Sequence, residues 1–288
     1  MNSDRDITIT EVGPRDGLQN ESTLVSVADK VALIDRLSWS GLPEIEVSAF
    51  VRPDVVPQLA DAAEVFAQIR RNDDVIYSAL VPNLRGLERA MAVGVDAISL
   101  FTAASETFAA RNTNATIGET IDRFRPVVEA AVAEGITVRA YISCAVACPF
   151  EGAVAASAVK ELAQRLCALG PMQIDLGDTI GVAVPDDIER LLAAVSPVVP
   201  MDDIVLHLHD TSGGAAACAR RGIECGVTRF DGACGGLGGC PFAPGAPGNI
   251  STEALLSLCA DLNLTSGVDR TAVAEAGAWM QSLVGRAE

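Results

Sequence analysis

Residues 203–234 read DIVLHLHDTSGGAAACARRGIECGVTRFDGAC, and this stretch contains a complete unit of strand, helix and strand. DIVLHLH (203–209) is a short run of apolar and β-branched residues, as expected of a buried strand. GAAACARRGIECG (214–226) is rich in alanine and stops at glycine, which is typical of a helix end. TRFDGAC (228–234) then begins a second strand. Strands joined by a crossover helix predict a parallel α/β fold.

The same alternation of short strands and longer helical segments repeats through the chain. The other expected strands are ITITEV (7–12), EIEVSAF (44–50), VIYSALV (75–81), AISLFT (97–102), TVRAYISC (137–144) and QIDLG (173–177). Eight such units predict a closed (β/α)₈ TIM barrel, because eight parallel strands close without leaving a sheet edge. A doubly wound open sheet is the main alternative. Against it, the first strand leads into VGPRDGLQNE (12–21), which lacks the Gly-rich dinucleotide fingerprint.

The C-terminal part of the chain extends this pattern. STEALLSLCADL (251–262) and VDRTAVAEAGAWMQSLVG (268–285) both have a helical pattern. We expect the region of about 251–288 to supply the last barrel helix and a C-terminal extra helix. The predicted fold class is therefore an α/β TIM barrel with a C-terminal helical extension. No break in composition marks a second domain, so we interpret residues 1–288 as a single catalytic domain.

Composition and charge exclude several classes of function. A net charge of −17 argues against a nucleic-acid-binding surface, which needs a basic face. No uncharged apolar stretch reaches the roughly 18 residues of a membrane-spanning helix. The N-terminal MNSDRDITIT resembles neither a signal peptide nor a transit peptide, which predicts a cytoplasmic protein. We expect its eight cysteines to be reduced thiols.

Polar residues stand at the carboxyl ends of several expected strands, where TIM barrels place their active sites. Each of them alone has a structural explanation, such as a helix cap or a buried ion pair. Their recurrence from strand to strand instead indicates one shared site. These residues are Arg15 and Asp16 after the first strand, Glu46 in the second, Asp178 after the sixth, His207, His209 and Asp210 at the seventh, and Cys240 and Asn249 after the eighth.

The chain contains only two histidines, His207 and His209, and they are two positions apart. The period of a strand puts both imidazoles on one face, with Leu206 and Leu208 on the other. With Asp16 from another strand, they predict a divalent-metal site. Mixed nitrogen and oxygen ligands suit Mg²⁺, Mn²⁺, Zn²⁺ or Fe²⁺. Two hydrogen-bonded core histidines are the alternative.

Residues 235–249, GGLGGCPFAPGAPGN, contain six glycines and three prolines. This composition is too rich in both for a helix or a strand, and it predicts a mobile active-site loop. On such a loop Cys240 can reach a closed site as a proton donor or acceptor. Asn249 can add an oxygen ligand or a hydrogen bond.

Five motifs together carry a resemblance that extends over nearly the whole chain. They are VGPRDGLQNE (12–21), ISCAVACPFEG (142–152), DLGDTIGVAVP (175–185), HLHDT (207–211) and GLGGCPFAPGAPGN (236–249). In this order they resemble the motifs of the 3-hydroxy-3-methylglutaryl-CoA (HMG-CoA) lyase family. That family belongs to a superfamily of metal-dependent TIM-barrel lyases and synthases. After HLHDT the chain reads SGGAAA (212–217), where family members carry an aromatic residue and a glutamine, which leaves the substituent at substrate C3 open.

The resemblance implies a lyase that cleaves HMG-CoA to acetyl-CoA and acetoacetate. It implies a bound Mg²⁺ or Mn²⁺, an acyl-CoA as substrate, and a homodimer. The implied metal ligands are Asp16, His207, His209 and Asn249. The implied catalytic residues are Arg15, which stabilises the thioester enolate, and Glu46, Asp178, His207 and Cys240, which order the substrate and the proton path.

Two further residues are implicated in substrate binding. The resemblance places Gln19 beside Arg15 at the substrate, and Arg111 is a candidate contact for the phosphates of CoA. Three alternatives remain open. They are a lyase for a related thioester such as citramalyl-CoA or a longer C3-substituted glutaryl-CoA, a synthase that condenses acetyl-CoA with a 2-keto acid, and a barrel that binds metal or acyl-CoA without chemistry.

Overall fold

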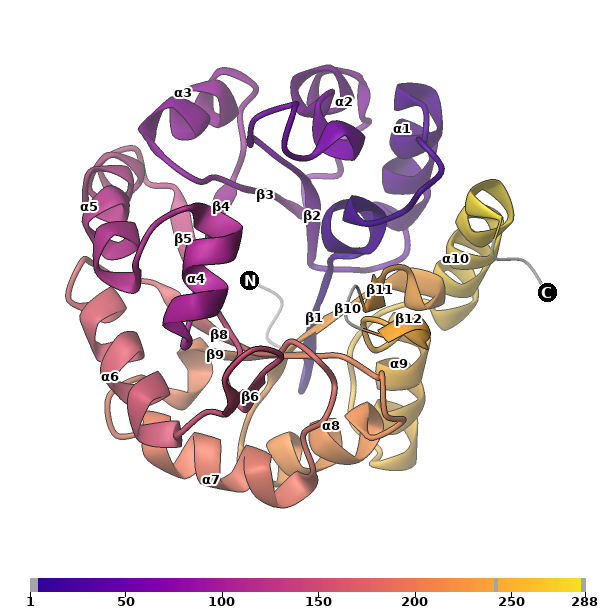
Figure 1. The fold of residues 1–288 in the computed structure, drawn as a ribbon. Coiled ribbons are helices and arrows are strands. Elements are labelled where there is room, and N and C mark those ends of the chain that lie inside the picture. Colours follow the sequence, from indigo (N-terminus) through magenta and orange to yellow (C-terminus); the bar gives the residue numbers. More distant parts are fainter. Residues whose placement is uncertain (1–4, 241–242, 286–288) are drawn as a thin grey trace.

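The computed structural model describes residues 5–240 and 243–285, and for residues 240 and 243–247 it describes the backbone alone. Within this part, eight parallel strands close into a barrel in the order β1-β10-β9-β8-β5-β4-β3-β2 (Figure 1). The strands are β1 (Thr8–Glu11), β2 (Glu44–Ala49), β3 (Ile76–Leu80), β4 (Ala97–Ala103), β5 (Thr137–Ser143), β8 (Gln173–Asp178), β9 (Ile204–Leu208) and β10 (Arg229–Gly232). Each coincides with an expected strand, so the TIM-barrel prediction is confirmed.

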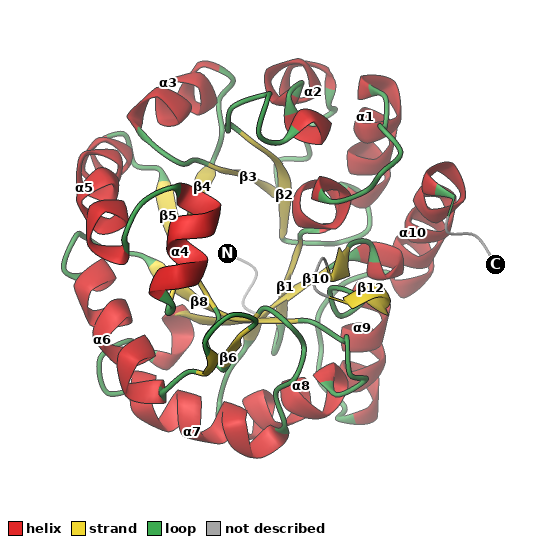
Figure 2. Cartoon of the chain, in the orientation of Figure 1, coloured by secondary structure: helices red, strands yellow, loops and turns green. Residues whose placement is uncertain are grey.

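Helices surround the barrel and bury its outer face (Figure 2). Their apolar stripes pack against the outward side chains of the strands and form one continuous core. The helix after each strand lies where the sequence pattern predicts it. These helices are α1 (Val27–Leu37), α2 (Ala62–Gln68), α3 (Leu84–Ala92), α5 (Ile117–Ala133), α6 (Ala156–Cys167), α7 (Pro185–Val195), α8 (Ala215–Glu224) and α9 (Thr252–Asp261).

The C-terminal extension is also confirmed. Helix α9 is the last helix of the barrel, and α10 (Arg270–Val284) follows it and packs against α1. The side chain of Asp269 caps α10 by accepting hydrogen bonds from the amides of Thr271 and Ala272. The described residues contain no helix that is long and apolar enough to cross a membrane.

The interior of the barrel is polar rather than filled with aliphatic side chains. Arg139 of β5 crosses it and donates to Asp231 (2.8 Å), Thr10 (2.8 Å) and Glu44 (3.1 Å). A buried guanidinium is tolerated because these acceptors compensate for its lost hydration. The outward side chains of the same strands, such as Leu206 of β9, belong to the apolar core. Along each strand, alternate side chains therefore point into the polar interior and outward into the apolar core.

Three elements at the mouth of the barrel were not predicted. Residues 235–249 include a short antiparallel hairpin of β11 (Gly239–Cys240) and β12 (Ala243–Pro247), so the expectation that this segment excludes strands was wrong. A strand depends on backbone pairing, and glycine keeps the amide that pairing needs. A second hairpin of β6 (Ala147–Cys148) and β7 (Gly152–Ala153), and helix α4 (Glu106–Thr113), also lie at the mouth (Figure 1).

The cysteines behave as the composition suggests. The seven whose side chains are described are all free thiols, and Cys144, Cys148, Cys218, Cys234 and Cys259 are buried. None of these seven forms a disulfide within the described residues, and the reduced state of the thiols stays a prediction.

Candidate active site at the mouth of the barrel

A tight turn after β1 carries Arg15 and Asp16. Residues Gly13–Gly17 form one turn of π-helix, in which the amides of Arg15 and Asp16 return to the carbonyl of Val12. A Cβ on Gly13 would lie 2.6 Å from the carboxylate of Glu11, and one on Gly17 would lie 2.8 Å from Leu237. Only glycine fits both positions, and this close packing aims the side chains of the turn into the mouth.

Arg15 is a buried cation held between two carboxylates. Its Nε donates to Oε2 of Glu46 on β2, and its Nη1 donates to Asp16. Burial alone would lower the pKa of Arg15, but the charges of Glu46 and Asp16 outweigh burial and raise that pKa well above its usual value. Within the described residues Nη2 makes no hydrogen bond. This donor is therefore free to bind an oxygen of a substrate.

Asp16, His207 and His209 bring three metal-ligating groups together. Their ligand atoms all lie within 4.8 Å of one another. Nε2 of His207 lies 3.3 Å from Nε2 of His209 and 3.8 Å from Oδ2 of Asp16. Asn249 pairs with His209 through an isolated β-bridge, and its Nδ2 donates to Asp16 (2.9 Å). A carboxylate and two imidazoles within reach of one point fit a divalent cation, and Asn249 lies beside them.

The ionisation of Asp16 and His209 favours metal binding. Burial would raise the pKa of Asp16, but the nearby Arg15 and the two imidazoles outweigh burial and lower it. Burial, followed by the neighbouring His207, lowers the pKa of His209 to about 4. At neutral pH, Asp16 is therefore an anion and His209 is neutral, and these are the forms that ligate metals.

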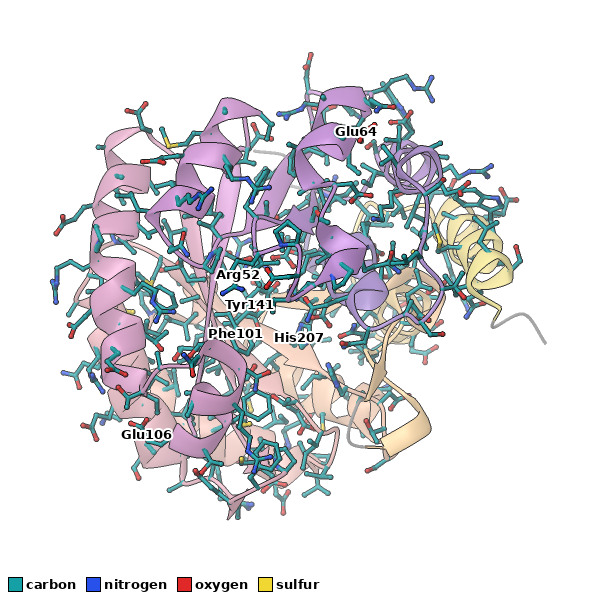
Figure 3. The ribbon with its side chains drawn as sticks, turned by 45° about the horizontal axis from the view of Figure 1, so that its top comes forward. Arg52, Glu64, Phe101, Glu106, Tyr141 and His207 are labelled. Carbon is teal, nitrogen blue, oxygen red and sulfur yellow. The ribbon has the colours of Figure 1, made fainter. Side chains whose placement is uncertain are left out.

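A layer of polar side chains beneath this site was not predicted from the sequence. His207 Nδ1 lies 3.0 Å from Oδ2 of Asp231, its neighbour in register on β10. The hydroxyl of Tyr141 lies 3.2 Å from Glu46 and 3.1 Å from Asp231, and its ring meets that of His207 edge-on. Figure 3 labels Tyr141 and His207 next to each other. Strand parity carries the missing signal, because Arg139 and Tyr141 share one face of β5, and that face must be the polar interior.

Asp175 of β8 completes this layer. One ligand atom each of Asp175, His207 and Asp231 lie within 4.8 Å of one another. Burial and the adjacent charge of Asp231 raise the pKa of Asp175 well above its usual value. Burial would also raise the pKa of Asp231, but Arg139 and His207 outweigh it and lower that pKa. The charge of the pair therefore resides on Asp231, next to the histidine.

Four other predicted residues have different contacts or lie partly outside the described residues. The carboxylate of Asp178 accepts hydrogen bonds from the amides of Val182 (3.3 Å) and Ala183 (2.9 Å) in its own loop. Gln19 is partly buried at the end of the Arg15 turn, and the guanidinium of Arg111 on α4 stacks over Phe150 at 4.1 Å. Cys240 lies in β11, and its side chain is outside the described part.

Comparison with known proteins agrees with this site. A family model described as HMGL-like matches residues 6–279. The chain belongs to the HMGL-like family. Membership accounts for the order of the five motifs along this HMGL-like chain and for the barrel that carries them.

Individual members of the HMGL-like family are similar over almost their whole length. The 3-hydroxy-3-isohexenylglutaryl-CoA/hydroxy-methylglutaryl-CoA lyase of Pseudomonas aeruginosa is 45% identical over 286 residues, which span 99% of this chain and 95% of that protein. The solved HMG-CoA lyase of Brucella melitensis is 45% identical with a TM-score of 0.96, covering 98% of this chain and 99% of its own. An HMG-CoA lyase of Acinetobacter baumannii, solved with coenzyme A and 3-methylmalate, is 36% identical with a TM-score of 0.93, covering 98% and 92%.

Proposed function

We propose that this HMGL-like chain is a lyase that cleaves HMG-CoA to acetyl-CoA and acetoacetate. One observation carries the proposal. The buried Arg15 cation and the donor set of Asp16, His207 and His209 face the same point at the mouth of the barrel. Relatives that are 36–45% identical over nearly the whole chain are named HMG-CoA lyases, and one was solved with coenzyme A.

The residues of the site can divide the reaction between them. Cleavage of the C2–C3 bond requires that the C3 hydroxyl pass its proton to the proton path that we assign to Glu46 and Asp178, and that the bonding electrons move into the thioester carbonyl. The free Nη2 of Arg15 can hold that carbonyl oxygen and stabilise the enolate charge that develops on it. Glu46 keeps the guanidinium in place through its bond to Nε. The enolate of acetyl-CoA is then protonated at C2. We assign this step to Cys240. His207 is the alternative donor only in a site where its Nε2 does not ligate the metal.

The proposed metal is Mg²⁺ or Mn²⁺, held by Asp16, His207, His209 and Asn249. When bound, such an ion lowers the pKa of a hydroxyl that it contacts. For Asn249 to act as a ligand, its amide must turn so that Oδ1 replaces Nδ2 toward the site. This turn gives up the hydrogen bonds that Nδ2 donates to Asp16 (2.9 Å) and to the carbonyl of Leu237 (3.3 Å), and coordination of the ion would have to replace them. We retain Asp178 and Gln19 as proposed substrate-ordering residues, and Arg111 as a proposed CoA contact.

A direct assay tests the function. Purified protein is stripped with EDTA and assayed for acetyl-CoA and acetoacetate from HMG-CoA, before and after addition of Mg²⁺ or Mn²⁺. We expect both products in equal amounts, no activity after EDTA, and recovery with either ion. A metal-replete, folded protein that releases neither product from HMG-CoA would contradict the proposal.

The acyl substituent needs its own comparison, because the Pseudomonas aeruginosa relative is named for two substrates. The segment after HLHDT carries small residues, and Gly213 has open space around the position of a Cβ. HMG-CoA, a longer C3-substituted glutaryl-CoA and citramalyl-CoA are therefore compared by kcat/KM. Release of free CoA that depends on an added 2-keto acid would instead indicate the condensing synthase.

Three further expectations accompany this proposal. We propose that residues 1–288 act as one catalytic domain, that the protein is a homodimer, and that it works in the cytoplasm. Light scattering coupled to size exclusion measures the oligomer. Fractionation of the source cells measures the compartment.

A further inference from the structure

The hydrogen bond between His207 and Asp231 connects the proposed metal site to the polar interior. Nδ1 of His207 lies 3.0 Å from Oδ2 of Asp231, and both side chains are almost fully buried, at 8% and 2% exposure. A neutral imidazole has one nitrogen that donates and one that accepts. Opposite a carboxylate, the donor must be Nδ1. Nε2 then keeps its lone pair on the side of His209 and Asp16.

The surroundings of Asp231 keep it an acceptor. Arg139 donates to Oδ1 from Nη1 at 2.8 Å, and a guanidinium has no acceptor to offer in return. The hydroxyl of Tyr141 lies 3.1 Å from Oδ2, the same oxygen that faces His207. The guanidinium of Arg139, which can only donate hydrogen bonds, therefore holds the carboxylate of Asp231 in place. Its orientation, and with it the donor role of His207 Nδ1, is determined by Arg139.

We propose that Asp231 is a positioning residue that fixes His207 in the tautomer with its proton on Nδ1, so that Nε2 is free to ligate a metal. A carboxylate behind a metal-ligating histidine commonly has this effect. The inference rests on the proposed metal role of His207. The tautomer itself, however, is a property of the metal-free protein and can be measured separately.

Asp231→Asn tests this role directly, because asparagine keeps the shape of the aspartate side chain and changes only its hydrogen-bonding groups. Arg139 only donates, so the amide oxygen of the variant must stay at the Oδ1 position. The NH₂ group then takes the Oδ2 position and donates toward Nδ1 of His207. Since Nδ1 must now accept, the proton moves to Nε2 and blocks its lone pair. An uncharged, isosteric change therefore inverts the tautomer.

The presence of only two histidines makes this tautomer directly observable. Protein labelled with ¹⁵N in its imidazoles gives two sets of ring signals, which a His209→Gln variant assigns. Long-range ¹H–¹⁵N spectra are recorded without metal, at a pH where both rings are neutral. We expect the Nδ1–H form for His207 in the wild type and the Nε2–H form in Asp231→Asn. Mn²⁺ titration by calorimetry should show a 10–100-fold loss of affinity in the variant.

Asp61→Asn is the matched control, because Asp61 pairs with the buried Lys30 at the starts of helices α1 and α2 and, within the described residues, forms no hydrogen bond or ion pair with His207 or Asp231. It should leave the His207 signals and the Mn²⁺ affinity unchanged. A wild-type His207 in the Nε2–H form would overturn the inference, and so would an unchanged tautomer in a folded Asp231→Asn. Wild-type protein that shows the expected tautomer but binds no Mn²⁺ contradicts the proposed function and leaves the tautomer assignment supported.

Discussion

Oε1 of Glu11 accepts a hydrogen bond of 2.8 Å from the backbone amide of Cys234, across the seam where the first and last strands of the barrel pair. The same oxygen accepts the amide of Gly13 at 2.8 Å, and Oε2 accepts the hydroxyl of Thr252 at 2.7 Å. Gly13 begins the turn that carries Arg15, Cys234 precedes β11, and Thr252 begins α9. One buried carboxylate therefore ties together three segments that shape the mouth.

Glu11 should make stability depend on pH. Burial raises its pKa from 4.5 to about 7, against the hydrogen bonds that it accepts. The native state holds this proton more tightly than the unfolded chain does. The protonated Glu11 therefore contributes its full stabilisation below pH 4.5, and this stabilisation is lost as the pH rises through 7. A change of pKa from 4.5 to about 7 corresponds to roughly 3 kcal/mol.

The variant Glu11→Gln isolates this effect, because an amide keeps the acceptor for both backbone amides and has no proton to lose. Its free energy of unfolding relative to wild type should rise by roughly 3 kcal/mol between pH 4.5 and pH 8. Urea denaturation at several pH values measures the difference. The exposed Glu64→Gln serves as control and should show no such trend. A difference independent of pH would show that Glu11 does not titrate in this range.

Variants of the Arg15–Glu46 ion pair should separate the effects on stability from the effects on catalysis. Arg15→Met leaves Glu46 buried without its cation, which should cost about 3–5 kcal/mol. Adding Glu46→Gln removes the uncompensated charge and should restore most of that stability. Lyase activity should fall by at least 10²-fold in both variants, because neither has a donor for the thioester oxygen. Recovery of activity along with stability would exclude Arg15 from catalysis.

Gly181 holds the loop after β8 against the histidine segment. A Cβ at this position would lie 2.8 Å from the carbonyl of His209 and 2.7 Å from the amide of Thr211, at a φ of +62°. Gly181→Ala should displace His209, weaken Mn²⁺ binding and lower stability by about 1–3 kcal/mol. Gly213→Ala is the matched control, since it has a φ of +73° but open space. Gly213→Ala should lower the free energy of unfolding through backbone strain, and its Mn²⁺ affinity should stay unchanged.

Asp16 should couple metal binding to stability. An ion that binds only the folded state and is present at a concentration of 100 times its Kd stabilises that state by about 2.7 kcal/mol. Thermal unfolding with and without Mn²⁺ should show this gain in the wild type and little of it in Asp16→Asn. Asp210→Asn is a useful control, because Asp210 caps α8 through the amide of Ala215 and an asparagine can do the same. Equal stabilisation of both variants would remove Asp16 from the ligand set.

The periodicity of the sequence predicts the barrel well. All eight strands are expected to within a few residues, because each is an apolar run between turn residues and helix ends. The two hairpins and α4 are missed, because their pairing partners or packing surfaces lie elsewhere in the fold. β11 is formed by Gly239 and Cys240, which have little strand propensity and pair only because Pro247 and Ala243 lie alongside.

The candidate site divides in the same way. Arg15, Asp16, Glu46, His207 and Asn249 are indicated by their places at strand ends and by the resemblance, and the structure brings them together. Asp178 occupies an equivalent sequence position, yet its carboxylate bonds to its own loop. At the end of a strand, where the backbone continues into a loop, the position of a residue in the sequence does not specify whether its side chain points into the barrel or away from it.

The number and order of the strands, the placement of His207 and His209 on one face, and the family all follow from the amino-acid sequence. They depend on local periodicity and on motifs along the chain. Three contacts follow from the folded chain instead: Asp231 behind His207, Tyr141 between Asp231 and Glu46, and Glu11 at the seam. Such contacts join residues from 24 to 223 positions apart, and the pairing of the strands together with the closure of the barrel brings them within hydrogen-bonding distance.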